Sequence, residues 1–207
     1  RDIMELVNPK SILLTETNVP NKENLSYFGD GDEAHMVYQF SLPPLLLHAL
    51  FSGNAGYFNQ WAASIPEVEN NCTFFNFTAS HDGIGVRPLE GLLPDAELTE
   101  LIEGMKAGGG MVSTRRNSDG SNSPYEMNIT YLDAMKRTNN GTDEFKLERF
   151  LTSQTTMMEM KGIPAFYIHS LLATANDCEG VAVRGHNRAI NRRILSADGL
   201  DQVLADP

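Results

Sequence analysis

The sequence predicts an α/β protein whose parallel strands form part of a barrel, with a functional site where the strands end. Three short apolar runs support this prediction, and each leads into polar side chains capable of chemistry. The runs and their polar endings are 11–16 with Glu16, 72–80 with His81 and Asp82, and 163–169 with His169. Because the carboxyl ends of parallel strands lie at one edge, we expect these groups to share a face.

The remaining elements follow from turn residues and apolar periodicity. Paired prolines at 43–44 predict the first turn of a helix, and Pro94-Asp95 predicts another. The expected order is a polar loop at 17–34, a strand at 35–40, helices at 43–51 and 56–64, a helix at 94–106, a helix at 145–161 and a long loop at 170–195.

The segment 83–144 is predicted to be an inserted subdomain. About 60 residues separate the strand at 72–80 from the helix at 145–161, too many for a plain connection. Within the segment, 115–123 is polar and rich in Gly, Ser and Asn, which predicts a mobile surface loop. A triple glycine at 108–110 lacks the Gly-Lys-Ser/Thr of a nucleotide-binding loop.

Composition excludes several classes of function. The chain has 207 residues and a net charge of −11, from 16 basic and 27 acidic side chains, so nucleic acid and anionic membranes are unsuitable partners. No apolar run reaches the roughly 18 residues of a membrane span. Cys72 and Cys178 are too few and too far apart for a zinc site or disulfide framework, and we expect both to be reduced. These observations predict a cytoplasmic protein without metal or cofactor.

Three motifs extend the strand-end observation. They are His81-Asp82-Gly83-Ile84-Gly85-Val86, Tyr125-Glu126-Met127-Asn128 and Asn187-Arg188-Ala189-Ile190-Asn191-Arg192. Together they resemble the sucrose phosphorylase and glucosylglycerate phosphorylase branch of glycoside hydrolase family 13, the α-amylase superfamily of (β/α)8 barrels. The His-Asp element occurs across that superfamily, whereas the longer strings are more specific to the branch. The resemblance covers nearly the whole chain.

The resemblance implies that the chain is the second half of a TIM barrel. A complete barrel needs about 250 residues, and both ends of the chain look cut: 1–7 reads as the end of a helix and 196–204 as the start of one. The implied division is strands five to seven with their helices in 1–82, the inserted subdomain in 83–144, and a helix, the eighth strand and an active-site loop in 145–207.

The resemblance also assigns chemistry. Retaining glycosidic chemistry uses two carboxyl groups about 5 Å apart, a nucleophile and an acid/base. Glu16 matches the family's acid/base, Asp82 its transition-state stabiliser, and His81 a residue that binds sugar hydroxyls. The nucleophile is expected at the end of the fourth strand, upstream of Arg1. The alternatives are a surface carboxylate starting a loop for Glu16 and a turn-opening residue for Asp82.

Basic residues suggest a phosphate pocket. Arg188 matches a family arginine that fixes the distant hydroxyls of the glucosyl ring. Arg184, His186 and Arg188 alternate, so on an extended segment they would share a side, and an anion pocket would add Arg87, Arg115 or Arg116. The alternative is ordinary loop arginines paired with surface carboxylates, which we favour for Arg115 and Arg116.

The chain departs from sucrose phosphorylases near the acceptor. Asn18 stands where they have His, Glu126 follows Tyr125 where they have Gln, and Ala189 stands where they have Asp. The run from Glu16 through Pro20 looks more like branch members that act on glucosylglycerate or related small glucosides. The substrate-binding candidates are His81, Arg188, Tyr125, Glu126, Asn18, His169 and Arg87.

The predicted function is that of a retaining α-glucoside phosphorylase. It would transfer a glucosyl group from a sucrose-like or glucosylglycerate-like donor to inorganic phosphate, giving α-glucose 1-phosphate. A hydrolase or transglucosidase of the same fold and a non-catalytic sugar-binding homologue are the alternatives. The isolated fragment is expected to be inactive without the nucleophile, and prone to self-association because a half barrel leaves unpaired strand edges.

Overall fold

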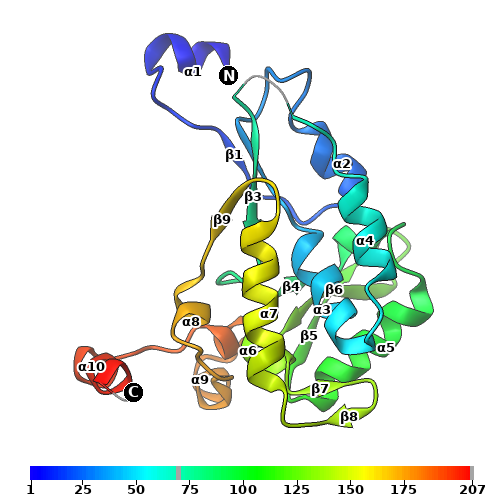
Figure 1. Ribbon diagram of the computed structural model, residues 1–207, viewed down its shortest axis with the longest axis vertical. Helices are drawn as coiled ribbons and strands as arrows, with labels where there is room; N and C mark the ends of the chain where they lie inside the picture. The colour runs from blue at the N-terminus through cyan, green and yellow to red at the C-terminus, as the bar shows by residue number, and fades with distance from the viewer. Residues whose placement is uncertain (69–70, 206–207) are drawn as a thin grey trace.

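A four-stranded parallel sheet lies at the centre of the computed structural model, which describes residues 1–68 and 71–205 (Figure 1). The strands are β1 (Leu14–Thr15), β2 (Met36–Tyr38), β3 (Thr73–Phe77) and β9 (Ile163–Ala165). They pair in the order β1-β2-β3-β9, and every neighbouring pair is parallel. The predicted α/β class and the parallel arrangement are confirmed, although each strand is shorter than the sequence run that predicted it.

One face of the sheet is covered by helices. They are α3 (Leu42–Ser52), α4 (Gly56–Ala63) and α7 (Lys146–Glu159), and the short α1 (Asp2–Val7) and α2 (Asn21–Ser26) lie toward the N-terminal end. Phe74 of β3 is 1% exposed and packs edge-on against Phe28, with ring centroids 5.1 Å apart. Burying such apolar side chains between sheet and helices is the main stabilising contribution of this layer.

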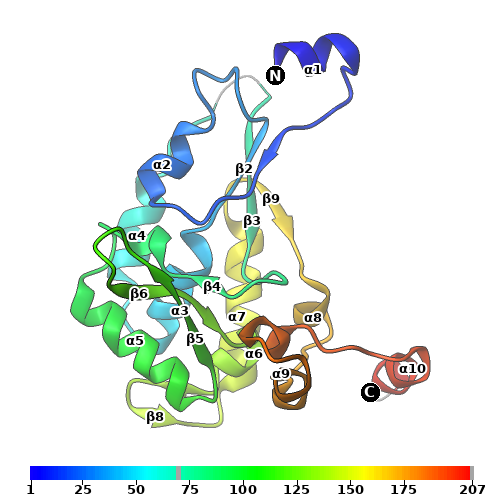
Figure 2. The ribbon, with the colours of Figure 1, turned by 180° about the vertical axis from the view of Figure 1, so that it is seen from behind.

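The other face of the sheet carries an aromatic cluster. Seen from behind, β2 and β3 lie in front of the helices (Figure 2). Tyr38, Phe40, Phe75 and Phe77 pack together there, with centroid separations from 4.6 to 5.5 Å. In a barrel this face points inward, and the interior is filled by side chains in layers.

Residues between β3 and α7 build a second, antiparallel sheet. Its strands β4 (Ile84–Gly85), β5 (Met111–Arg116) and β6 (Asn122–Asn128) have the order β4-β6-β5. Around it lie η1 (Arg87–Leu89), α5 (Asp95–Ala107), α6 (Tyr131–Ala134), and the pair β7 (Arg137–Thr138) and β8 (Gly141–Thr142). Apolar residues of α5, β6 and α6 share one core with those of α3 and α7, so this segment packs firmly on the helical layer.

Two predicted loops are regular structure instead. The segment 115–123 is the tip of the β5–β6 hairpin, closed by a hydrogen bond from the Asn117 amide to the Ser121 carbonyl at 2.8 Å. The segment 170–195 contains the second half of α8 (Ile168–Leu171), then α9 (Cys178–Arg184) and η2 (Asn187–Asn191). The polar composition of both segments predicted loops. Cross-strand pairing in the first segment and helix caps in the second nevertheless stabilise regular structure.

Helix α9 has recognisable caps at both ends. The Asp177 carboxylate accepts a hydrogen bond from the Gly180 amide at 2.9 Å, and Gly185 ends the helix with a φ of 69°. An aspartate N-cap and a left-handed glycine after the last turn are the usual boundary residues of a helix. A final helix, α10 (Ala197–Ala205), follows. Within the described residues, no helix combines the length and apolar character needed to cross a membrane.

We predict that Gly104→Ala destabilises the fold. A Cβ at this buried position of α5 would collide with the Phe51 ring of α3, and overpacking costs about 1–3 kcal/mol. The helix propensity of alanine offsets at most about 1 kcal/mol. Gly108→Ala is the control, because its added Cβ makes contacts no closer than 3.4 Å. Urea denaturation should give a lower midpoint for Gly104→Ala only, and equal midpoints would contradict the packing argument.

Candidate active site

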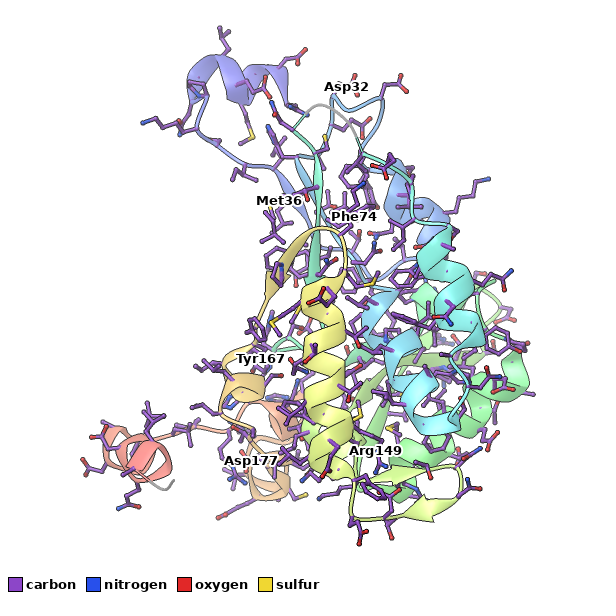
Figure 3. The ribbon with its side chains drawn as sticks, in the orientation of Figure 1. Asp32, Met36, Phe74, Arg149, Tyr167 and Asp177 are labelled. Atoms are coloured by element: carbon purple, nitrogen blue, oxygen red, sulfur yellow. The ribbon has the colours of Figure 1, made fainter. Side chains whose placement is uncertain are left out.

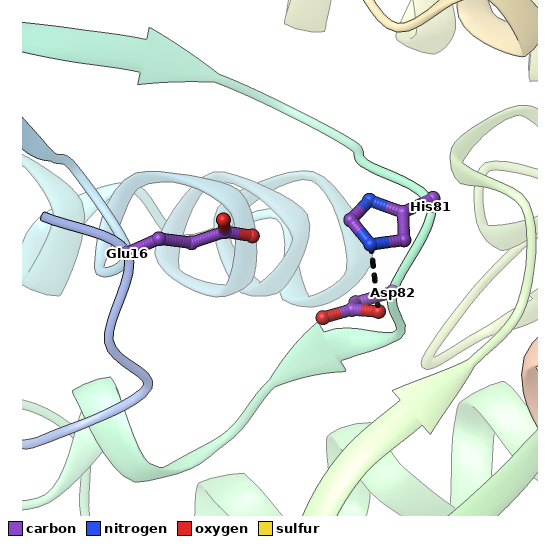
Figure 4. Close-up of side chains that lie close together, drawn as sticks. All are labelled: Glu16, His81 and Asp82. Atoms are coloured by element: carbon purple, nitrogen blue, oxygen red, sulfur yellow. Dashed lines mark ion pairs between the residues drawn. The ribbon is translucent and has the colours of Figure 1, made fainter. Parts of the chain in front are cut away.

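Three predicted polar residues meet at the carboxyl ends of β1 and β3. Glu16 directly follows β1, while His81 and Asp82 follow β3 after a short turn. One ligand atom from each of the three lies within 4.8 Å of the others. Figure 4 shows the Glu16 carboxylate directed toward the pair, and His81 Nε2 lies 3.5 Å from Asp82 Oδ1. The parallel register of β1, β2 and β3 causes this meeting, since it brings their carboxyl ends to one edge.

A cavity of about 230 Å³ opens beside these groups. Segments far apart in the sequence contribute its lining: the residues after β1, the turn after β3, strand β6 and helix η2. The lining residues are Glu16, Asn18, Phe40, Asp82, Gly83, Gly85, Tyr125, Glu126 and Arg188. Six of the sequence-predicted site residues therefore lie on one cavity, and His81 lies at its edge through its contact with Asp82.

The glycines of the His-Asp-Gly-Ile-Gly run permit close packing around the cavity. A Cβ at Gly83 would lie 2.5 Å from the Asn128 amide nitrogen, and one at Gly85 would lie 2.6 Å from the Asn18 side-chain oxygen. Glycine at both positions lets β4 pass between Asn18 and β6. The Asn18 side chain then donates a hydrogen bond to the Tyr125 carbonyl at 3.4 Å.

Arg188 joins the two carboxylates on the far side of the cavity. Its Nε and Nη2 atoms bind the two oxygens of Glu126 at 2.8 and 2.9 Å, a bidentate pair. Its Nη1 atom lies 2.6 Å from Asp82 Oδ1. Arg192 adds a second ion pair to the same oxygen at 3.0 Å. The sequence motif contained Arg192, but its spacing alone did not mark it as a site residue.

The Glu126–Arg188 pair keeps both members charged at neutral pH. Burial alone would raise the pKa of Glu126, but hydrogen bonds from Arg188 and Asn128 outweigh it and hold that pKa below its ordinary value. The hydrogen bond to Glu126 raises the pKa of Arg188. Because Glu126 is only 3% exposed, this pair is a fixed feature of the cavity wall.

Two predicted residues lie outside the cavity. His169 sits in α8 rather than at the end of β9, and its Nδ1 contacts the Thr174 hydroxyl at 3.2 Å. Burial and the positive charge of Arg193 lower its pKa. Arg87 donates to the Asn18 carbonyl at 3.2 Å and pairs with Glu90 at 3.4 Å. It therefore supports the Asn18 segment instead of lining the cavity.

The predicted row of alternating basic residues does not form. Arg184 ends α9 and pairs with Asp177 at 2.7 Å, whereas Arg188 belongs to η2. Between them Gly185 is left-handed and His186 is extended, so the three basic residues do not lie on one extended segment. Arg115 pairs with Glu90 at 3.6 Å, as its alternative interpretation held. Arg184 and Arg115 are therefore paired with other carboxylates, and an anion pocket around Arg188 stays a prediction.

Glu16, His81 and Asp82 are also the residues that could share a metal ion, from the closeness of their ligand atoms. Two arginines already neutralise the charge of the Asp82 carboxylate, so its electrostatic attraction for a metal cation is reduced. That the site works without metal stays a prediction.

In comparisons with known proteins, the chain is similar to glucoside phosphorylases. It is 47% identical over 207 residues to a glucosylglycerate phosphorylase of Escherichia coli, covering all of this chain and 37% of that protein. It is 46% identical to a glucosylglycerate phosphorylase of Spirochaeta thermophila, over all of this chain and 35% of that protein. A sucrose phosphorylase of Agrobacterium vitis is 31% identical over 88% of this chain and 37% of that protein. No family model matches.

The fold comparison agrees. The crystal structure of a sucrose 6F-phosphate phosphorylase from Thermoanaerobacter thermosaccharolyticum aligns with a TM-score of 0.79 and 22% identity, over all of this chain and 41% of that one. The resemblance to the glucosylglycerate and sucrose phosphorylase branch is confirmed, and the chain has the fold of part of such a TIM-barrel enzyme. It spans little more than a third of the curated relatives' length.

We predict that Glu126→Gln destabilises the fold at neutral pH and less so in acid. The folded-state pKa is depressed, so the pair stabilises the fold above the ordinary glutamate pKa of about 4.3 and loses this effect as the pH falls through the folded value. Losing the charged hydrogen bonds should cost about 1–3 kcal/mol at pH 7. Denaturation midpoints at pH 7 and about pH 3.5 check this, with the exposed Glu103→Gln as control. A pH-independent loss would contradict it.

Proposed function

We propose that this chain carries the acid/base and the stabilising carboxylate of a retaining α-glucoside phosphorylase. Such an enzyme transfers a glucosyl group from a small glucoside to inorganic phosphate and forms α-glucose 1-phosphate. The observation that carries the proposal is the meeting of Glu16, His81 and Asp82 at the carboxyl edge of parallel strands, where Glu16 and Asp82 line one cavity. The names of the curated relatives point to the same reaction class.

Each residue has a role that its position allows. Glu16, at the mouth of the cavity, would protonate the leaving oxygen and then take the proton of the incoming acceptor. Asp82, fixed by two arginines, would stabilise the positive charge on the sugar ring in the transition state. His81 would hydrogen-bond sugar hydroxyls. The nucleophile would be an aspartate on the preceding strand, supplied by the part of the intact enzyme outside this chain.

The two outer strands of the parallel sheet are consistent with a barrel whose other strands lie outside this chain. β1 and β9 are its outer strands, and the apolar side chains of Ile12, Leu14, Ile163 and Phe166 are exposed along them. We propose that 1–82 and 145–207 form the second half of a barrel, closed by strands of the missing half, and that 83–144 is its inserted subdomain. The isolated chain would then be inactive and would self-associate.

The donor is proposed to be glucosylglycerate or a similar small glucoside. Asn18 and Glu126 line the cavity where sucrose phosphorylases carry histidine and glutamine, so the acceptor end differs from theirs. Recognition of a carboxylate on the aglycone would need a cation in the acceptor part of the site. A charged hydrogen bond of this kind contributes about 1.5–3 kcal/mol to the binding free energy. That cation would come from the missing half, because Arg188 is already paired with Glu126 and Asp82.

The same pairing supports a second candidate. Among the described cavity-lining residues Arg188 is the one permanent cation, and two carboxylates hold it. A cavity without an unpaired cation suits water as acceptor better than phosphate, so a hydrolase or transglucosidase of the same fold is the alternative.

Product analysis on the intact enzyme separates the candidates. We expect α-glucose 1-phosphate from glucosylglycerate only when phosphate is present, and sucrose to be the poorer donor by about tenfold to a hundredfold at equal concentration. Glucosylglycerol, which has the polyol but no carboxylate, is the matched comparison. Free glucose at the same rate without phosphate would favour the hydrolase, and sucrose ahead by tenfold would overturn the donor assignment.

A second test addresses Glu16. We predict that Glu16→Gln in the intact enzyme abolishes turnover of ordinary glucosides but spares α-glucosyl fluoride, whose leaving group needs no proton. Glu23→Gln, an exposed glutamate on α2, should leave both rates unchanged. Steady-state rates with the two donors check the prediction. Equal loss on both donors would remove Glu16 from the acid/base role.

A further inference from the structure

The turn that carries Asp82 is held by two consecutive residues from the far end of the chain. The Asn191 amide donates to the Ser80 carbonyl at 3.0 Å and to the Asp82 carbonyl at 2.7 Å. Arg192 Nε donates to the His81 carbonyl at 2.5 Å. Three consecutive carbonyls of this turn are therefore bound by side chains that lie about 110 residues away in the sequence.

The segment that supplies these side chains is itself fixed. Four consecutive carbonyls, from Ala189 to Arg192, each accept a hydrogen bond from outside η2. The donors are Arg184 Nη2 to Ala189 at 2.9 Å, the Asp177 amide to Ile190 at 2.8 Å, the Tyr167 hydroxyl to Asn191 at 2.9 Å, and Arg184 Nη1 to Arg192 at 2.8 Å. Figure 3 labels Tyr167 and Asp177 beside α8 and α9.

Apart from these contacts, the turn is held by the ion pair between Arg188 and Asp82 and by a hydrogen bond from the Asp82 amide to the Ser80 hydroxyl at 3.1 Å. It lies between β3 and β4 and belongs to no sheet, and His81 is exposed. A stabilising carboxylate must be held within about 0.5 Å of its productive position. Both hydrogens of the Asn191 amide are used on the turn, while its Oδ1 is buried and lacks a hydrogen-bond partner. The two hydrogen bonds that Asn191 donates to the turn offset the cost of burying this unsatisfied oxygen.

We infer that Asn191 and Arg192 are positioning residues that hold the catalytic turn, and through it the Asp82 carboxylate, in a reactive geometry. Neither residue lines the cavity that contains Glu16, although Asn191 and Asp82 both line a second pocket beside it. Arg192 acts twice, on the His81 carbonyl and on Asp82 Oδ1 at 3.0 Å. The inference rests on the role proposed above for Asp82, but not on phosphate being the acceptor.

The chain contains a matched control for Asn191. Asn76 of β3 is also a buried asparagine whose amide donates to two carbonyls, those of Met160 and Lys161 at 3.1 and 3.2 Å, and whose Oδ1 lacks a partner. It ties β3 to the end of α7, away from the cavity. Asn76→Ala and Asn191→Ala therefore remove equivalent hydrogen bonds, and only the second frees the Asp82 turn.

The test measures fluoride release from α-glucosyl fluoride by the intact enzyme, together with thermal unfolding. Both alanine variants should lose similar stability. Asn191→Ala should lower kcat about a hundredfold with little change in KM, whereas Asn76→Ala should stay near wild type. Glu16→Gln, run in parallel, should keep this activity, which separates loss of the acid from misplacement of Asp82. Turnover is measured with phosphate present as the acceptor of the glucosyl group. The first step expels fluoride and leaves the glucosyl group on the nucleophile without using phosphate, so a burst of fluoride measured without phosphate reports the Asp82 effect even if the phosphorylase assignment fails.

A surface pair keeps the test valid if the buried variants fold poorly. Arg192→Lys keeps the charge but loses the guanidinium geometry that reaches both His81 and Asp82, and it should lower kcat at least about tenfold. Arg193→Lys, at the exposed neighbouring position, should not change it. Equal kcat for the two asparagine variants, or for the two lysine variants, would overturn the inference.

Discussion

The ion pairs of Arg188 are the interaction on which the rest of the site depends. This one guanidinium joins three segments that are distant in the sequence: η2, strand β6 through Glu126, and the turn after β3 through Asp82. Removing it would leave Glu126 without an ionic partner and Asp82 with Arg192 alone, and a buried charge that loses its partner costs several kcal/mol. The antiparallel sheet, the end of the chain and the parallel sheet therefore share one electrostatic centre.

Backbone geometry makes this centre possible. A side chain at Gly83 or Gly85 would collide with Asn128 or Asn18. Because both residues are glycines, β4 can lie close to Asn18 and to β6, the strand that carries Glu126 to Arg188. Caps at Asp177 and Gly185 fix α9, and α9 in turn delivers η2 to the cavity. These two glycines and the two helix caps thus set the positions of the charged groups, and the ion pairs between those groups hold the segments together.

The sequence predicted the parts of the site that depend on strand ends. Glu16, His81 and Asp82 could be placed together because parallel strands bring their carboxyl ends to one edge. The arginines could not be sorted in this way, because the sequence does not show which carboxylate each one pairs with, and Arg87, Arg184 and Arg188 pair with different ones. Likewise the segment 115–123 has the composition of a loop, and cross-strand pairing makes its two ends part of β5 and β6 while 117–121 forms the turn. Asp177 and Gly185 are typical helix-boundary residues and could have predicted α9, where the sequence analysis predicts a loop.

The ion pair with Arg188 shows an effect of Glu126 that its position in the sequence did not predict. A glutamate there binds Arg188 through both oxygens and is itself ionised, so the arginine has little attraction left for an incoming anion. A glutamine at the same position would donate one amide group and accept with one oxygen, leaving Arg188 with Asp82 as its single charged partner. The residue after Tyr125 therefore controls how strongly this wall of the cavity attracts anions, and any group that recognises an acceptor's negative charge has to act from another wall.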